Sequence, residues 1–241
     1  MRRTIMLGLA AAAVAASGCG EARSENGGPT VERSYKVGKF DRVDLSGAYD
    51  VTIRTGAAPG VSARGNEKMI ERLVVEVRDG VLLIHPEKRK GLSWGRWNHG
   101  KVSVSVTVPS LSGAQLSGAG DIRIDEVKGD RFEGGIAGAG DLAIDRVEVG
   151  ALKFTIDGAG SAKVGSGRAR SADYEINGAG DIDAKGLAAE TAAVSIAGAG
   201  SVAAHASGTA NVRIMGAGDV DMTGGAKCTI SKAGAGDVRC S

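Results

Sequence analysis

Hydrophobic and polar residues alternate along most of this 241-residue chain, and short Gly-Ala-Gly corners interrupt the alternation at regular intervals. Two residues before the first glycine of each corner stand Leu116, Ile136, Ile156, Ile176, Ile196, Ile214 and Lys232. Four residues after that glycine stand Ile122, Leu142, Ala162, Ile182, Val202, Val220 and Val238. A hydrophobic period of two is typical of β-strands that bury one face, so we expect strands on both sides of every corner.

The corners recur at a nearly fixed spacing. Gly-Ala-Gly occurs seven times, at intervals of 20, 20, 20, 20, 18 and 18 residues, beginning at Gly118, Gly138, Gly158, Gly178, Gly198, Gly216 and Gly234. A fixed period of this length in β-type sequence indicates a solenoid in which each repeat is one coil. We therefore predict an all-β fold with very little helix. Residues 111–241 should form a right-handed parallel β-helix, or β-solenoid, with coils of 18–20 residues.

The section from 35 to 110 is less regular, but it is also rich in strand-forming residues. Residues 74–84 place Asp-Gly between two hydrophobic runs, which predicts a β-hairpin. Residues 101–108 alternate strictly and end before a proline. The sequence LSGAYDV at 45–51 is similar to LSGAGDI at 116–122, so it predicts an eighth, degenerate corner. We expect this section to be the N-terminal part of the same solenoid.

An aspartate or a serine follows every regular corner. The aspartates are Asp121, Asp141, Asp181, Asp219 and Asp237. Both residue types form hydrogen bonds with nearby backbone groups in turns, and we favour this structural role. The alternative is a column of carboxylates that binds calcium. Calcium-binding β-rolls have a nine-residue repeat, and serine interrupts the column here, so we assign neither a metal nor a cofactor.

The N-terminus has the organisation of a bacterial export signal. A basic start at Arg2 and Arg3 precedes an apolar run at 5–16, which is too short to span a bilayer as a stable helix. Small residues then lead to Cys19, as in a lipobox. This similarity implies a lipoprotein signal peptide at 1–18 and lipid attachment to Cys19. Ordinary signal cleavage nearby is the alternative.

The residues after the cysteine bear on where the protein resides. Residues 19–34 are mostly small or polar, and we interpret them as a flexible tether between the lipid and the domain. Two acyl chains hold a protein stably on a membrane. Gly20, directly after the cysteine, favours the outer membrane over the inner one. We therefore expect an exported protein, anchored by lipid in the cell envelope at the outer membrane.

Composition and charge narrow the classes of fold and partner. The 39 glycines lack the every-third-residue period of collagen, and a hydrophobic content of 42% does not suit a disordered chain. Two of the 30 basic residues lie in the signal peptide, and the remaining 28 equal the 28 acidic residues in number. Zero net charge without a basic block argues against general nucleic-acid binding.

The least repetitive segment after the signal peptide is 85–100, which contains both tryptophans of the chain. Its candidate binding residues are Lys88, Arg89, Lys90, Trp94, Arg96, Trp97 and His99. Tryptophan and arginine together are typical of binding hot spots, and tryptophan also suits sugar stacking or a membrane interface. The alternative is that the tryptophans only cover the N-terminal sheet. The segment 91–95 matches a nucleophile-elbow motif, but it lacks the strand and helix that this motif requires.

Two cysteines remain in the last coil. Cys228 lies six residues before the final corner and Cys240 six residues after it, so both side chains should point inward. An exported protein lies where disulfides persist. We predict a Cys228–Cys240 disulfide that fastens the C-terminal end of the solenoid. Two buried free thiols are the alternative.

Residues 40–51, the hairpin at 74–84 and the serial Ser-Gly-Ala-Gly-Asp corners resemble one family of bacterial envelope proteins, the "putative auto-transporter adhesin, head GIN domain" family. The resemblance extends over about 38–238. It implies a β-solenoid and a role in adhesion, and it supplies no catalytic residues.

We therefore expect a non-enzymatic, lipid-anchored β-solenoid that is monomeric and contacts an envelope protein or a glycan. A polysaccharide-active β-helix enzyme is one alternative, but such enzymes cluster charged residues on one outward strand face, and here the charges alternate in sign. A scaffold that assembles end to end is another alternative. Lys232 at a normally apolar position, together with the expected disulfide, argues against it.

Overall fold

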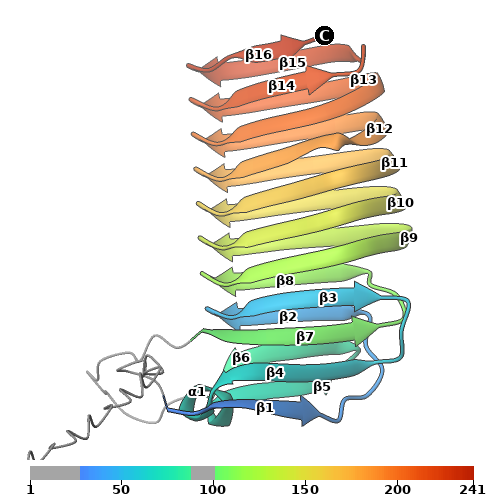
Figure 1. The fold of residues 1–241 in the computed structure, drawn as a ribbon. Coiled ribbons are helices and arrows are strands. Elements are labelled where there is room, and N and C mark those ends of the chain that lie inside the picture. The colour runs from blue at the N-terminus through green and yellow to red at the C-terminus, as the bar shows by residue number, and fades with distance from the viewer. Residues whose placement is uncertain (1–27, 88–100) are drawn as a thin grey trace, which may run out of the picture.

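The computed structural model describes residues 28–87 and 101–241 as a long solenoid built from one 16-stranded sheet (Figure 1). The N-terminal part contains β1 (Thr30–Tyr35), β2 (Arg42–Gly47), β3 (Asp50–Thr55), β4 (Gly60–Asn66), α1 (Glu67–Glu71), β5 (Leu73–Arg78), β6 (Val81–Pro86) and β7 (Val102–Val108). The stacked coils contain β8 (Gly113–Gly118), β9 (Asp121–Gly138), β10 (Asp141–Gly158), β11 (Ser161–Gly178), β12 (Asp181–Gly198), β13 (Ser201–Gly216), β14 (Asp219–Thr223), β15 (Lys227–Gly234) and β16 (Val238–Cys240). The predicted parallel β-solenoid is confirmed.

Each of the strands β9 to β12 is a single curved strand of 18 residues that runs from one corner to the next. Neighbouring coils pair in parallel, and a residue lies opposite the residue 20 positions further along the chain. Ile122 lies opposite Leu142, for example, and Leu142 lies opposite Ala162. The register continues into the corners, where Gly138 lies opposite Gly158. The sequence period is therefore the length of one coil.

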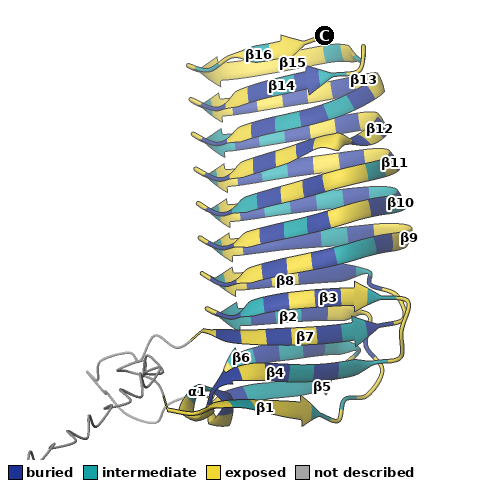
Figure 2. Ribbon diagram, viewed as in Figure 1, coloured by how far each residue is buried: buried dark blue, intermediate teal, exposed yellow. Residues whose placement is uncertain are grey.

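The alternation in the sequence corresponds to the inner and outer surfaces of the coil wall. Figure 2 shows buried and exposed residues alternating along the coils from β9 to β13. The inward residues stack in columns and form one continuous core. The largest fully buried side chains include those of Phe132, Phe154 and Tyr174, in three successive coils. Most other core positions are aliphatic, because a thin coil leaves room for few large side chains.

The degenerate corner at 45–51 is a corner of the solenoid. β2 pairs in parallel with β8, with Leu45 opposite Leu116. β3 pairs in parallel with β9, with Asp50 opposite Asp121. β6 and β7 add a further parallel layer to β2 and β3, on the side away from the regular coils (Figure 1). The coil architecture therefore extends into the N-terminal section.

Antiparallel strands and a short helix lie at the N-terminal end. β4 pairs with β7, β1 pairs with β4, and β5 pairs with β6, each in antiparallel fashion. The β5–β6 pair is the predicted hairpin, and its turn residues Asp79 and Gly80 have φ values of 50° and 78°. The sequence places residues 30–34 in the tether, but they lie in β1 and pair with β4 instead.

The helix α1 was not expected from the sequence. It spans five residues, and its preceding residue Asn66 accepts a hydrogen bond from the Lys68 N–H at 3.1 Å. Such a cap satisfies a backbone donor that a helix N-terminus otherwise leaves free. Ile70 of this helix has an exposed fraction of 0%. α1 therefore covers apolar residues at the N-terminal end of the core.

The coils shorten by two residues between β12 and β13, which have 18 and 16 residues. The register shifts between Ala184 and Ala188, and again between Ala189 and Thr191. On both sides of these shifts the strands stay paired, and the corner glycines Gly198 and Gly216 lie opposite each other. The shorter coil is accommodated at the end opposite the corner, while the corner itself stays in register.

Candidate functional site

Each regular corner requires two glycines for two different reasons. Gly158, the first glycine of its corner, has a φ of 140°, and a Cβ there would collide with the carbonyl oxygen of Gly138 in the preceding coil. At Gly160, the second glycine of that corner, a Cβ would lie 2.7 Å from Ile136 Cγ2. The intervening Ala159 donates its N–H to the Gly138 carbonyl at 2.8 Å. Left-handed backbone and close approach between coils together explain the Gly-Ala-Gly pattern.

The first corner departs from this pattern, because Tyr49 takes the place of the second glycine. Its ring packs beneath Gly47, where a Cβ would lie 3.3 Å from Tyr49 Cε2 and 3.4 Å from Pro86 Cδ. Tyr49 is 4% exposed. Burial is the main cause that raises the pKa of its phenol, with a smaller contribution from Tyr35. The sequence showed the deviation at position 49 but not its packing role.

The aspartates that follow the corners bond to the next coil rather than to their own turn. Asp121 Oδ1 accepts a hydrogen bond from the Asp141 N–H at 3.3 Å. Asp219 Oδ1 accepts one from the Asp237 N–H at 2.8 Å. The sequence predicts hydrogen bonding to nearby backbone in the turn, whereas the acceptor and donor here are 20 or 18 residues apart. These aspartates therefore connect successive coils.

Serine adds a second donor wherever it follows aspartate in this column. Ser161 Oγ donates to Asp141 Oδ1 at 2.6 Å, and Ser201 Oγ donates to Asp181 Oδ1. The Ser201 N–H also donates to Asp181 Oδ1, at 3.2 Å. Within residues 28–87 and 101–241, no group of three or more His, Cys, Asp or Glu side chains could hold a metal ion. Protein donors thus contact these carboxylates directly.

Outward charges on one face of the solenoid form ion pairs between coils. The register places Glu133, Lys153 and Asp173 in one column, where the charges alternate in sign. Lys153 Nζ lies 3.5 Å from Glu175 Oε2, which is outside this column, whereas Glu133 pairs at 3.1 Å with Arg42 of the same column. Exposed ion pairs of this kind contribute about 1 kcal/mol or less to stability. The charges of this column are therefore neutralised partly within it and partly by a neighbour beside it.

The other face also carries ion pairs. Lys163 Nζ lies 3.8 Å from Asp183 Oδ2, the residue opposite it in the next coil. Lys185 Nζ lies 3.8 Å from Asp221 Oδ2, two coils further along. Asp221 also lies opposite Arg239 in the register of β14 and β16. The described surface thus distributes opposite charges among neighbouring coils rather than gathering one sign.

The last coil contains both remaining cysteines. Cys228 in β15 and Cys240 in β16 form a disulfide, with Cα atoms 6.6 Å apart. In the same coil, Lys232 occupies the apolar column and lies opposite Ile214 of the preceding coil. Its Nζ donates to the Gly236 carbonyl at 2.6 Å. The end of the solenoid is therefore closed by a covalent bond and by a cation at the corner.

Several candidate residues lie outside the described parts of the chain. They are the lipidation residue Cys19, the nucleophile-elbow match at 91–95, and the binding residues Lys88, Arg89, Lys90, Trp94, Arg96, Trp97 and His99. The flanks of the tryptophan segment are described. β6 ends at Pro86 beside Gly47, and β7 begins at Val102, one residue before the position opposite Asp50. Both flanks lie at the corner edge of the N-terminal section.

Among the described residues, two buried side-chain hydroxyls have no hydrogen-bond partner, those of Tyr35 and Tyr174. The Tyr174 hydroxyl is buried and unpaired, and the ring stacks on Phe154 with centroids 6.5 Å apart. Burial raises the pKa of Tyr174 well above its ordinary value. The surrounding inward positions of this coil include Ala162 and Ala172, both 2% exposed. The tyrosine ring therefore fills space that these small side chains leave.

The sequence of the chain matches a known protein family. A family model described as "Putative auto-transporter adhesin, head GIN domain" matches residues 39–226. The chain belongs to this family. Membership of an adhesin family implies an exported or cell-surface protein. The match to the head GIN domain ends just before β15, so the coil with the disulfide lies beyond the matched residues.

Solved structures share the solenoid architecture. A "putative adhesin" from Bacteroides fragilis has a TM-score of 0.81 and 23% sequence identity, covering 90% of this chain and 99% of that one. A "putative lipid binding protein" from Parabacteroides distasonis has a TM-score of 0.67 and 22% identity, covering 89% and 97%. A "putative adhesin" from Parabacteroides merdae has a TM-score of 0.68 and 19% identity, covering 89% and 97%. At these identities the likeness shows the fold alone.

None of the curated proteins matches this head GIN domain in sequence. Among the described residues, no helix has the length and apolar character needed to cross a membrane.

Proposed function

We propose that this head GIN domain is a non-catalytic, lipid-anchored adhesion or interaction module of the bacterial cell envelope. The observation that carries the proposal is the match of 39–226 to an adhesin family on a regular solenoid. The outward charges support a non-catalytic role, because they pair across coils instead of converging on one groove. A catalytic groove would be expected to bring perturbed acidic and basic groups together.

Lipid attachment at Cys19 would fix the orientation of the solenoid. Cys19 follows the apolar run, and β1 begins at Thr30, eleven residues later. Eleven extended residues reach at most about 40 Å. The N-terminal end of the solenoid would therefore lie near the membrane. The C-terminal coil would lie at the far end of the stack (Figure 1).

The tryptophan segment is our candidate for the contact with an envelope protein or a glycan. Its flanking residues Pro86 and Val102 lie at the corner edge of the N-terminal section. The segment supplies Trp94, Arg96 and Trp97, residue types that dominate binding energies at interfaces. The paired charges on the coil faces make those faces weaker candidates for a specific contact.

Binding by the Trp94→Ala/Trp97→Ala double variant tests the contact. We expect a loss of at least about tenfold in binding to envelope extract or to the best ligand on a glycan array. Met215→Ala is the matched control, because Met215 is an exposed large apolar residue (56%) on a distant coil. Phosphatidylglycerol-containing vesicles form a separate arm that reports membrane contact. Binding equal to that of wild type would exclude the segment as the contact.

The anchor is tested independently of the contact. Cells expressing Cys19→Ser should lose incorporation of labelled palmitate and release the protein from the membrane fraction. Cys228→Ser is the matched control, because its cysteine lies in the last coil. Equal labelling of the wild type and the Cys19→Ser variant would exclude lipidation at this residue.

A further inference from the structure

The two ends of the solenoid are closed in different ways. At the N-terminal end, the outermost strands β1 and β5 pair in antiparallel fashion with β4 and β6, and α1 lies beside them (Figure 1). At the C-terminal end, no described element lies beyond β15 and β16. β15 pairs with β13 along one edge, and seven of its eight residues are exposed. An unpaired strand edge of this kind can pair with another chain.

The last coil also exposes residues that earlier coils bury. Ile230 occupies an inward column, opposite Val212, yet it is 48% exposed, because no coil covers it. Val212 itself is only 2% exposed. The end therefore combines a free backbone edge with an apolar centre, which are the two features that hold neighbouring coils together. A second solenoid is a chemically matched occupant for this surface.

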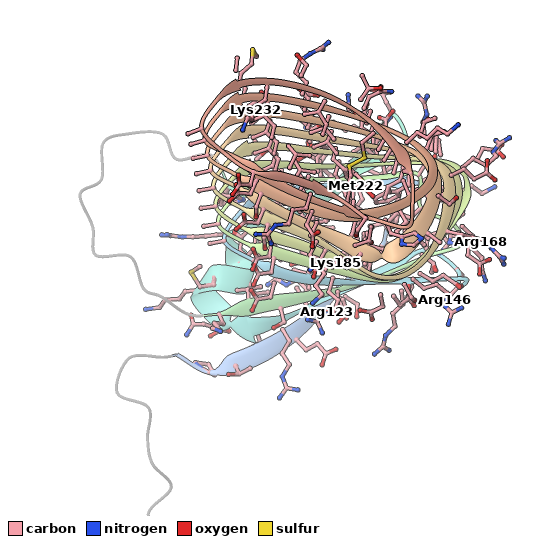
Figure 3. All side chains as sticks on the ribbon, turned by 90° about the horizontal axis from the view of Figure 1, so that it is seen from above. Arg123, Arg146, Arg168, Lys185, Met222 and Lys232 are labelled. Atoms are coloured by element: carbon pink, nitrogen blue, oxygen red, sulfur yellow. A yellow bond between two sulfur atoms is a disulfide. The ribbon has the colours of Figure 1, made fainter. Side chains whose placement is uncertain are left out.

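Lys232 opposes that contact. Its column contains Leu116, Ile136, Ile156, Ile176, Ile196 and Ile214 in the preceding coils. Viewed along the stack, Lys232 lies within the outline of the coil (Figure 3). Its ammonium group is held at the corner by the Gly236 carbonyl. A stacked coil would take this charge out of water without supplying a carboxylate, which is unfavourable.

The disulfide also opposes stacking of a second solenoid on the last coil. Cys228 lies above Ala210, and Cys240 lies above Met222, both of which are almost fully buried. The bridge thus covers the end of the core in place of a further coil. It also joins β15 to β16 covalently, with the two Cα atoms 6.6 Å apart.

The charges of the last coil also oppose stacking between two copies of the chain. Residues 227–240 contain Lys227, Lys232 and Arg239 against a single acid, Asp237. Two such ends facing each other would repel. We propose that Lys232 and the Cys228–Cys240 disulfide form a cap that prevents the last coil from stacking on a second copy of this chain.

The test compares the self-association of four variants of the full mature chain by sedimentation velocity over a wide concentration range. The first restores the apolar column with Lys232→Ile, the second removes the bridge with Cys228→Ala/Cys240→Ala, and the third combines these changes. Lys227→Ile is the matched control, because this lysine of the same strand is outward and exposed. We expect the association constant of the combined variant to exceed that of the control by about tenfold or more.

Hydrogen exchange identifies the surface that associates. In the associated state of the combined variant, the amides of β15 should gain protection, while those of β10 should exchange as in the wild type. Circular dichroism establishes that each variant remains folded, and a fifth variant, Lys232→Arg, which keeps the charge, should remain monomeric. The proposal is overturned if the folded combined variant stays as monomeric as the wild type. It is also overturned if association leaves β15 unprotected, or if the wild type itself stacks through β15.

Discussion

Phe154 lies directly over Gly134 of the preceding coil, so close that a Cβ on residue 134 would be 2.5 Å from Phe154 Cε1. Leu142 Cδ2 would be 2.8 Å from the same Cβ. The missing side chain at 134 is thus the space into which the aromatic ring fits. A narrow core accommodates an aromatic residue here because the coil beneath it supplies a glycine.

Gly134→Ala should lower the free energy of unfolding by about 1–3 kcal/mol, as is usual for overpacking a close-packed core. Urea denaturation measures this change. Gly38→Ala is the control, because a Cβ at Gly38 meets nothing within 4 Å. Adding Phe154→Leu to Gly134→Ala should recover part of the loss, which gives a coupling energy of about 0.5–3 kcal/mol. Purely additive effects would contradict the proposed contact.

Gly158→Ala should destabilise the protein more than Gly56→Ala. Both glycines have positive φ, at 140° and 86°, so both substitutions impose backbone strain. A Cβ at Gly56 meets nothing within 4 Å, whereas one at Gly158 collides with the Gly138 backbone. The difference between the two unfolding midpoints therefore measures the close approach of the coils. Equal midpoints would mean that φ alone selects glycine at the corner.

Tyr174→Phe should stabilise the protein at neutral pH by about 1 kcal/mol, because it removes a buried hydroxyl that has no partner. The substitution should also change the alkaline limb of the stability profile. Burial raises the pKa of Tyr174 in the folded state, so the folded protein binds this proton more tightly than the unfolded chain. The stabilisation that arises from this tighter proton binding is fully present below the unfolded-state pKa of tyrosine, about 10. It is lost as the pH rises above that value.

The measurement is chemical denaturation of the wild type and Tyr174→Phe from neutral pH to above pH 10. Below that pH the two stability curves should run parallel, with the variant higher. Above it, the wild type should lose stability more steeply. Curves that remain parallel throughout would show that Tyr174 does not carry the alkaline dependence.

Calcium should leave the thermal unfolding midpoint unchanged, and so should a chelator. The carboxylates of Asp121 and Asp219 accept hydrogen bonds from backbone N–H groups of the next coil, and Asp181 accepts from Ser201. Protein donors thus stabilise the column without a cation. Differential scanning calorimetry with calcium, magnesium and chelator provides the test. A midpoint that rises selectively with calcium would support the metal interpretation instead.

The sequence was most informative where one residue type recurs at a fixed position. The columns that contain Ile136 and Leu142 predicted both the period and the inward face, because a one-residue error would turn every side chain outward. The corner glycines predicted how the coils stack, because they recur once in every coil. These features depend on local geometry that repeats in every coil, so each coil provides the same information.

Features that depend on a single tertiary contact could not be predicted from the sequence. Residues 30–34 are polar enough to suggest a tether, and only their pairing with β4 makes them a strand. α1 is too short to produce a helical period, and tertiary burial of Ile70 stabilises it. Lys153 lies opposite Glu133 in the register, but its long side chain pairs with Glu175 instead. The candidate binding segment has no repeat against which it can be aligned.

The loss of two residues between β12 and β13 shows that one side of this solenoid is fixed and the other is adjustable. At the corner, Gly198 and Gly216 keep their register, while the shift is absorbed around Ala184–Ala188 and Ala189–Thr191 on the opposite side. Evolution or design can therefore lengthen a single coil at its rounded end without disturbing its neighbours. A peptide epitope inserted there would be displayed at a height along the stack that the choice of coil determines.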